Sequence, residues 1–188
     1  MSNTMVAALQ MVSTHDIDEN LHQASLLLAQ AARQGARMAV LPENFAVLDT
    51  ANMPVHGRRE RTTDGPIRHF LAEQAVRHGI WIVGGSLPIA SRPGGEPLDQ
   101  RVRASCIVVD DQGTEVARYD KIHLFDAMVE DSQGQYRESD TFEPGEALVT
   151  LDTPAGRLGL AICYDLRFPE LFRQLREREV DWVTLPSA

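Results

Sequence analysis

The sequence predicts one α/β domain in which helices and strands alternate and pack in layers. Through the first third of the chain, strand and helix signals follow one another at short spacing, which favours an α/β fold over an all-β or all-helical one. A helical pattern, a glycine and a strand-like run occur twice in that order. The 188 residues are 43% apolar and contain no linker or low-complexity segment, so we expect residues 1–188 to share one core.

The first helix has signals at both ends. A buried strand at 4–10 (TMVAALQ) precedes it, and Asp16 is placed to cap it, with Glu19 three residues later. Gly35 lies just past its end, and a second strand follows at 37–41. Apolar residues at helical spacing predict its buried face: Ile17, Leu21, Ala24, Leu28 and Ala31.

The second helix repeats this arrangement. Asp64 and Pro66 introduce it, Gly79 ends it, and a strand follows at 80–84 (IWIVG). Its predicted buried face consists of Ile67, Phe70, Leu71 and Ala75.

The second half of the chain predicts more strands and one further helix. Prolines and glycines indicate a surface loop at 88–100, and strands at 101–109 and 114–119 are joined by a hairpin turn at 110–113. Residues 126–146 predict a long polar loop, of a kind that is often functional. The remaining elements are strands at 147–151 and 157–162 around a turn at 154–156, a helix that begins near Pro169 and buries Leu171, Phe172 and Leu175, and a strand at 180–185.

The charge balance argues against a nucleic-acid-binding protein. The chain has 18 basic and 27 acidic residues, and its formal net charge of -9 repels phosphate backbones. The densest basic cluster, at 58–61, is interrupted by Glu60, and we predict a solvated loop there. No apolar run is long enough to span a membrane, and the first residues lack the basic region of a secretory signal. We therefore expect a cytoplasmic protein without a membrane partner.

The two cysteines are the first candidates for chemistry. Two are too few for a disulfide framework, and both fit a reducing compartment. Cys106 falls inside a strand-like run, where a small thiol is expected to be buried. Cys163 ends a strand-like run and precedes Pro169, so it lies at the sheet edge where α/β proteins bind ligands. A helix N-terminus nearby favours the thiolate, so Cys163 is either a packed thiol or a nucleophile.

Two charged residues share the placement of Cys163. Glu43 follows the strand at 37–41 directly, and Lys121 follows the strand at 114–119. Each residue alone is the ordinary surface charge of a loop. Together with Cys163, they place a carboxylate, an ammonium and a thiol at three strand ends, which a folded sheet can bring to one rim.

Such a set is sufficient for acyl transfer. A thiol attacks a carbonyl or nitrile carbon as the thiolate, so a base must take its proton and later activate a water, and Glu43 is the candidate. The tetrahedral intermediate carries an oxyanion, which a fixed ammonium and a backbone N–H stabilise. Lys121 and the amide of Tyr164, the residue after Cys163, are the candidates for that role.

The motifs around these residues resemble those of the nitrilase superfamily of carbon-nitrogen hydrolases. LPENF around Glu43, YDKIHLFD around Lys121 and GLAICYDLRFPEL around Cys163 occur in the family's order and match its Glu-Lys-Cys triad. The resemblance implies a second glutamate near the pocket, which matches Glu138. It also implies hydrolysis of a small amide through a cysteine thioester.

The resemblance implies a four-layer αββα sandwich that pairs into a homodimer or higher homo-oligomer through the helix after the nucleophile. The flanking residues look most like the branch of deaminated glutathione amidases and omega-amidases, which hydrolyse terminal amides of 2-oxo acid derivatives. The expected partners are thus a small-molecule amide and water, without cofactor or metal. Arg167 is expected either to neutralise Asp165 or to approach a substrate carboxylate. Relatives continue beyond the last strand, so we expect the C-terminal part of the sandwich to be missing here.

Other hypotheses have less support. His123, two residues from Lys121, is a candidate base for a cysteine-histidine hydrolase, but no second partner motif accompanies it. No HxxxH, HExxH or paired-cysteine spacing predicts a metal site. The segment Gly84-Gly85-Ser86 lacks the lysine and spacing of a phosphate loop and is predicted to be a tight turn. A nitrile or N-carbamoyl hydrolase of the same superfamily, and a non-catalytic interaction subunit of this fold, remain alternatives.

Overall fold

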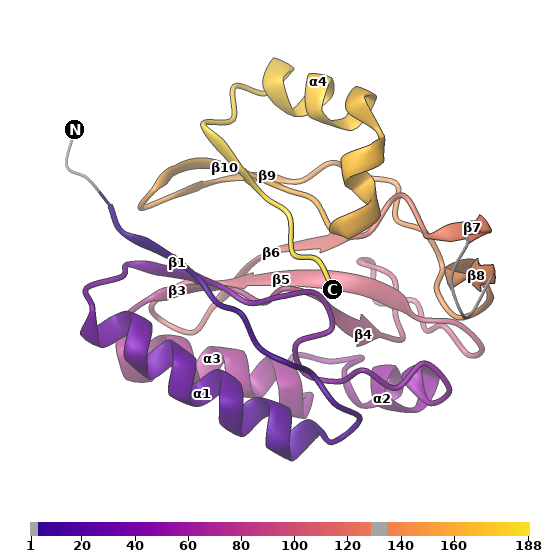
Figure 1. Cartoon of the computed structure of the whole chain (residues 1–188), viewed down its shortest axis with the longest axis horizontal. Helices are drawn as coiled ribbons and strands as arrows, with labels where there is room; N and C mark the ends of the chain where they lie inside the picture. The colour runs from indigo at the N-terminus through magenta and orange to yellow at the C-terminus, as the bar shows by residue number, and fades with distance from the viewer. Residues whose placement is uncertain (1–3, 129–134) are drawn as a thin grey trace.

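Four layers stack in the order helix, sheet, sheet, helix in the computed structural model (Figure 1). The structure describes residues 4–128 and 135–188. The helices are α1 (Ile17–Arg33), α2 (Met53–Arg59), α3 (Pro66–His78) and α4 (Pro169–Glu177), with 3-10 turns at Glu138–Asp140 and Cys163–Arg167. The strands are β1 (Val6–Ala8), β2 (Met38–Val40), β3 (Trp81–Val83), β4 (Leu87–Ile89), β5 (Arg103–Val109), β6 (Glu115–Asp120), β7 (Asp126–Met128), β8 (Gln135–Arg137), β9 (Thr150–Thr153), β10 (Gly156–Leu160) and β11 (Trp182–Thr184). The predicted αββα layering is confirmed.

The first sheet combines parallel and antiparallel pairs. Its order is β1-β2-β3-β5-β4, and β6 pairs with β5. Strands β1, β2 and β3 are parallel, whereas β5 is antiparallel to each of its neighbours. Helices α1 and α3 lie on the same face of this sheet (Figure 1), as right-handed crossovers between parallel strands place them. The two helix-glycine-strand passages in the sequence are these crossovers.

The central strand β5 is buried on both faces because a layer covers each of them. Ile107 and Val109 belong to the core shared with α1 and α3. Cys106 and Val108 alternate with them and belong to the core between the two sheets, together with Leu160 of β10. All seven residues of β5 are buried, so the prediction of Cys106 as a packed thiol is confirmed.

The second sheet carries the last helix on its outer face. Strand β10 pairs antiparallel with β9 and parallel with β11, and α4 connects β10 to β11. Leu171 and Leu175 of α4 pack on Ala161. Gly159 of β10 allows this approach, because an added Cβ would lie 3.1 Å from a methyl group of Leu175. Because Gly159 and Ala161 are small, α4 lies close to the second sheet, whose strand β10 leads to Cys163.

The ends of α1 and α3 follow the sequence signals. Asp16 caps α1, and its side chain accepts the N–H of Glu19 at 3.1 Å. Helix α3 begins at Pro66 and ends at Gly79, whose φ of 60° is the left-handed conformation that a glycine adopts at low cost.

The prediction of a solvated loop at 58–61 is wrong. Arg58 and Arg59 end α2, a seven-residue helix that the sequence analysis did not predict. Glu60 is only 1% exposed, and its carboxylate accepts the N–H groups of Ile67 and Arg68 at 3.0 and 3.1 Å. These N–H groups belong to the first turn of α3 and have no hydrogen-bond partner within the helix. The Glu60 carboxylate satisfies them and is buried, whereas the charge pattern predicted a solvated position.

Two predicted loops also contain strands. Strand β4 begins just before the segment predicted as a loop at 88–100, and β7 and β8 form a hairpin within the predicted loop at 126–146. Residues 129–134 of that loop lie outside the described residues. No helix in the described ranges is long and apolar enough to cross a membrane.

Candidate active site

The structure brings Glu43, Lys121 and Cys163 together from the ends of three strands. Glu43 follows β2, Lys121 follows β6, and Cys163 follows β10, so both sheets contribute. The Lys121 ammonium donates to Glu43 Oε1 at 3.0 Å, and the nearby carboxylate of Glu43 raises the pKa of the Cys163 thiol. Glu43 is 7% exposed and Lys121 only 2%, so the pair lies almost entirely out of solvent.

The loop that carries Glu43 is fixed by the segment 84–86, which connects β3 to β4. Ser86 Oγ accepts the N–H of Asn44 at 2.9 Å, and Asn44 has a φ of 54°, which is uncommon for a residue with a side chain. Gly85 has a φ of 53°, and a Cβ there would lie 1.9 Å from the carbonyl oxygen of Pro42. The prediction of a tight turn at 84–86 is wrong, because β3 and β4 both pair antiparallel with β5 and the chain continues along β5 through this segment. The segment instead supports the loop that carries Glu43.

Lys121 is held between two carboxylates. Its Nζ lies 3.0 Å from Oε1 of Glu43 and 3.0 Å from Oε1 of Glu138. The backbone N–H of Lys121 donates to the carbonyl oxygen of Ala104 in β5 at 2.9 Å. Burial lowers the pKa of the Lys121 ammonium, but Glu43 and Glu138 outweigh burial, so the net pKa is raised. Lys121 therefore keeps its positive charge at neutral pH.

Glu138 lies next to Lys121, to which it is hydrogen-bonded at 3.0 Å. Its second oxygen accepts the N–H of Phe125 at 2.6 Å, so one carboxylate joins the ammonium of Lys121 to the backbone that follows it. Glu138 begins a 3-10 turn in the segment predicted as a long polar loop. Apart from the resemblance, nothing in the surrounding sequence distinguishes it from a solvated glutamate.

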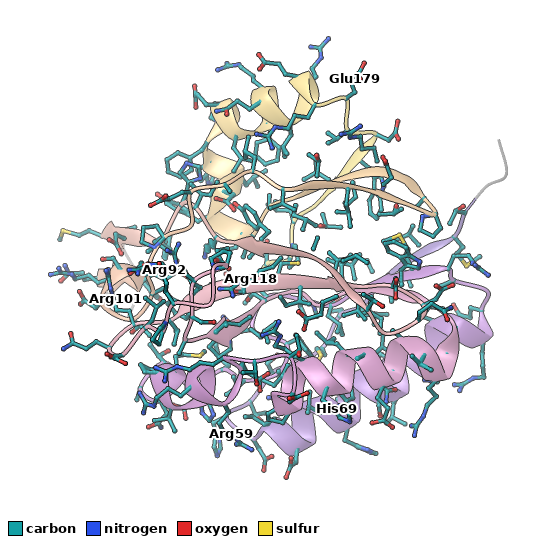
Figure 2. The ribbon with its side chains drawn as sticks, turned by 180° about the vertical axis from the view of Figure 1, so that it is seen from behind. Arg59, His69, Arg92, Arg101, Arg118 and Glu179 are labelled. Carbon is teal, nitrogen blue, oxygen red and sulfur yellow. The ribbon has the colours of Figure 1, made fainter. Side chains whose placement is uncertain are left out.

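An arginine-rich network supports Lys121 through its neighbour Asp120. The Asp120 carboxylate accepts bonds from Ser105 Oγ at 2.6 Å and from Arg118 Nε at 2.8 Å. Figure 2 shows Arg92, Arg101 and Arg118 at the same end of the molecule, where they line a cavity of about 680 Å³. Glu143 pairs with Arg92, Arg101 and Arg103. Because these guanidinium groups are paired with protein carboxylates, we assign the network a structural role.

Cys163 has a strained backbone at the start of the 3-10 turn that follows β10. Its φ is 45°, and its N–H donates to the carbonyl oxygen of Pro186 at 2.9 Å. The N–H of Ala188 donates to Glu43 Oε2 at 3.0 Å, so the segment after β11 also borders the site. Burial, together with the charge of Glu43, raises the pKa of the Cys163 thiol to about 11. The thiol is therefore protonated at neutral pH, and the nearby carboxylate of Glu43 is the candidate acceptor of its proton.

Tyr164 and Arg167 occupy different surroundings. The Tyr164 ring packs edge-on against Phe125 and Phe168, at centroid distances of 4.9 and 5.5 Å. Arg167 is exposed. The predicted neutralisation of Asp165 by Arg167 is wrong, because the buried Asp165 carboxylate is bound by groups from elsewhere in the chain.

His123 does not face the thiol in the manner of a general base. Its Nδ1 lies 2.7 Å from Asp165 Oδ1, and its ring stacks on the ring of Phe168 with a centroid distance of 3.6 Å. The carboxylate that raises the pKa of the Cys163 thiol is that of Glu43. Among the described residues, no group of three or more His, Cys, Asp or Glu side chains has an arrangement that could hold a metal ion.

Comparison with known proteins identifies the family of this chain. The sequence profile of the carbon-nitrogen hydrolase family matches residues 5–187. The chain belongs to the carbon-nitrogen hydrolase family. Its relatives in this family include a deaminated glutathione amidase of Yersinia enterocolitica, 41% identical over 188 residues, and the human omega-amidase NIT2, 32% identical over 189 residues. All of this chain is covered in both comparisons, and it spans 64% of the length of each relative.

Solved structures of this family share the fold. The C. elegans NitFhit protein matches 100% of this chain with a TM-score of 0.80 and 29% identity, over 45% of its own length. Nit3 of Saccharomyces cerevisiae, a member of branch 10 of the nitrilase superfamily, matches 97% of this chain with a TM-score of 0.80 and 27% identity, over 64% of its length. A mutant amidase from Nesterenkonia sp. AN1, with acrylamide added at its active site cysteine, has a TM-score of 0.79 and 26% identity, covering 97% of this chain and 66% of the amidase.

Proposed function

We propose that this protein is an amidase that hydrolyses the terminal amide of a small carboxylic or 2-oxo acid through a thioester on Cys163. The observation that carries the proposal is the placement of Glu43, whose carboxylate accepts the ammonium of Lys121 at 3.0 Å and lies near enough to Cys163 to raise the pKa of its thiol. A base, a cation and a nucleophile brought to one place, with the base and the cation buried, are the groups that acyl transfer requires.

In the first half of the reaction, the Cys163 thiol passes its proton to Glu43 as its sulfur bonds to the amide carbon. The carbonyl oxygen becomes an oxyanion, stabilised by the Lys121 ammonium and the backbone N–H of Tyr164. The carbon-nitrogen bond then breaks, the leaving nitrogen takes the proton from Glu43, and ammonia departs. The acyl group remains on the sulfur as a thioester.

Water completes the cycle. Glu43 takes a proton from the water as its oxygen attacks the thioester carbon, and Lys121 and the Tyr164 amide stabilise the second oxyanion. The carbon-sulfur bond breaks, and the sulfur recovers its proton from Glu43. The sum is amide plus water giving carboxylic acid plus ammonia. Because the pKa of the thiol is raised to about 11, the proton is transferred within the substrate complex rather than lost to solvent beforehand.

The relatives support the class of substrate. Deaminated glutathione amidases and an omega-amidase are among the similar proteins, and both names denote hydrolysis of amides. Glu138 positions Lys121 in this proposal, and Arg167, which is exposed four residues after Cys163, is the candidate contact for a substrate carboxylate. We further propose a cytoplasmic homodimer or higher homo-oligomer, as the resemblance implies, which size-exclusion chromatography tests.

Site-directed variants test the proposal. The protein is incubated with omega-amides of 2-oxo acids, including deaminated glutathione, and ammonia release is measured. We expect Cys163→Ala, Glu43→Gln and Lys121→Ala each to lower kcat/KM by at least about 10³-fold, since each removes a reacting or charge-stabilising group. His123→Ala serves as the comparison and should lower it far less.

Two results would contradict the proposal. Loss of activity with His123→Ala alone would support a cysteine-histidine hydrolase. If the wild-type protein turns over no amide, nitrile or carbamoyl compound, the non-catalytic interaction subunit is favoured.

A further inference from the structure

The carboxylate of Asp165 joins the turn that carries Cys163 to the segment that carries Lys121. Asp165 has no exposed surface and accepts four hydrogen bonds. Two reach Oδ2, from the hydroxyl of Tyr119 at 2.6 Å and the N–H of Ile162 at 2.9 Å. Two reach Oδ1, from the N–H of His123 at 3.0 Å and its Nδ1 at 2.7 Å.

On one side, these bonds close the turn around the cysteine. The N–H of Ile162, the residue before Cys163, donates to the Asp165 side chain, and the N–H of Asp165 donates back to the carbonyl oxygen of Ile162 at 3.0 Å. Cys163 lies inside this closed turn with its φ of 45°. A residue with a Cβ leaves that conformation unless its surroundings hold it there, so the two bonds oppose relaxation of the turn.

On the other side, the bonds fix both flanks of Lys121. Tyr119 lies two residues before the lysine and His123 two residues after it, and both donate to Asp165. The Tyr119 side chain is completely buried, and the His123 ring is held against Phe168 with an interplanar angle of 9°. The same carboxylate therefore holds the nucleophile turn and the lysine segment, which are about 40 residues apart in the sequence.

We propose that Asp165 is a positioning residue that holds the thiol of Cys163 in register with the Glu43–Lys121 pair, and that Tyr119 and His123 act through it. This inference rests on the proposed amidase function. A displacement of about 1 Å between reacting groups lowers a rate by about 10²-fold. A positioning role therefore predicts a loss in kcat, whereas KM changes little because the binding groups remain.

His123 gives the sharpest test because its side chain is partly exposed. His123→Leu removes the Nδ1–H donor, whereas His123→Asn places an amide N–H near the position of Nδ1. We expect His123→Leu to lower kcat about 10-fold, with KM within about 3-fold, and His123→Asn to recover most of the loss. Asp165→Asn turns an amide NH₂ toward two donors and is expected to lower kcat about 100-fold.

The control separates positioning from general destabilisation. The control variant is Ile82→Val. Ile82 lies in the core between the first sheet and helices α1 and α3, away from Asp165 and its partners. This variant should lower the melting temperature but leave kcat unchanged. If the His123 and Asp165 variants lose no more kcat than Ile82→Val at a comparable fall in melting temperature, the positioning role is refuted.

A second measurement does not depend on turnover. Alkylation of Cys163 by iodoacetamide, followed by mass spectrometry as a function of pH, reports whether the thiol still faces Glu43. In His123→Leu and Asp165→Asn, we expect faster labelling at pH 8 than in the wild type, and wild-type labelling in His123→Asn. A wild-type labelling profile in all three variants would overturn the inference. If the wild-type protein hydrolyses no amide, the proposed function fails, whereas this labelling arm still decides whether Asp165 positions the thiol.

Discussion

Gly85 offers a test of how the fold fixes the position of Glu43. Its φ is 53°, and an ideal Cβ would lie 1.9 Å from the carbonyl oxygen of Pro42 and 2.7 Å from that of Leu41. Both oxygens belong to the backbone that leads into Glu43. Gly85→Ala must therefore push that backbone away, because no flexible side chain is available to yield.

The magnitude follows from two contributions. The left-handed conformation costs an alanine about 1–2 kcal/mol, and forcing extra volume into a packed site costs about 1–3 kcal/mol. A total of about 3 kcal/mol lowers the melting temperature of a domain of this size by roughly 6–12 °C. Ordinary contact begins near 3.4 Å, so the Pro42 oxygen must move by about 1.5 Å (3.4 minus 1.9). A shift of that size at Glu43 lowers kcat by about 10²-fold.

Gly94→Ala is the matched control for this substitution. A Cβ at Gly94 meets nothing within 4 Å, and its φ is not positive. Thermal melting and amide hydrolysis are measured for both variants. We expect Gly94→Ala to behave as the wild type and Gly85→Ala to be less stable and about 100-fold slower. A Gly85→Ala protein with wild-type melting and kcat would refute the reasoning.

Two further predictions concern ionisable groups. Because burial and Glu43 raise the pKa of the Cys163 thiol to about 11, its alkylation rate should increase about tenfold per pH unit between pH 7 and 10, and a plateau below pH 9 would contradict this. Cys106, whose thiol pKa burial raises to about 12, should be labelled only after unfolding. Burial also raises the pKa of Glu60 in the folded protein above its unfolded value of about 4.5. Protonated Glu60 therefore stabilises the fold below the unfolded pKa, and this stabilisation is lost as the pH rises through the folded-state pKa. Urea unfolding should therefore show Glu60→Gln gaining stability relative to the wild type between pH 4 and 7, and a pH-independent difference would count against the assignment.

Local signals in the sequence predicted the alternation of helices and strands and the placement of Glu43, Lys121 and Cys163 at strand ends, whereas the αββα layering was implied by the family resemblance. Asp16, Pro66 and Gly79 act within one helical turn of their own positions, so their roles can be inferred from neighbouring residues. The same holds for Glu43 and Cys163, because a charged or nucleophilic residue directly after a buried strand lies at the sheet edge wherever that strand is placed.

Features that depend on distant contacts could not be predicted. Helix α2 contains Gly57, a residue that weakens helices and so hides the helix in the sequence. Glycine is required there because a Cβ would lie 2.5 Å from the side chain of Val102, which is far along the chain. His123 and Tyr119, which donate to the Asp165 carboxylate, are 42 and 46 residues away, whereas Arg167, two residues away, was the partner expected from sequence proximity. The burial of Glu60 likewise follows from its contact with the start of α3, which the charge pattern does not reveal.

The central claim is that Cys163 forms a covalent acyl intermediate. Intact-protein and peptide mass spectrometry after rapid acid quenching of the reaction with an omega-amide tests it directly. We predict an acyl adduct on the peptide that contains Cys163, absent from Cys163→Ala and dependent on Glu43. An adduct on Cys106, or ammonia release from Cys163→Ala at the wild-type rate, would contradict it.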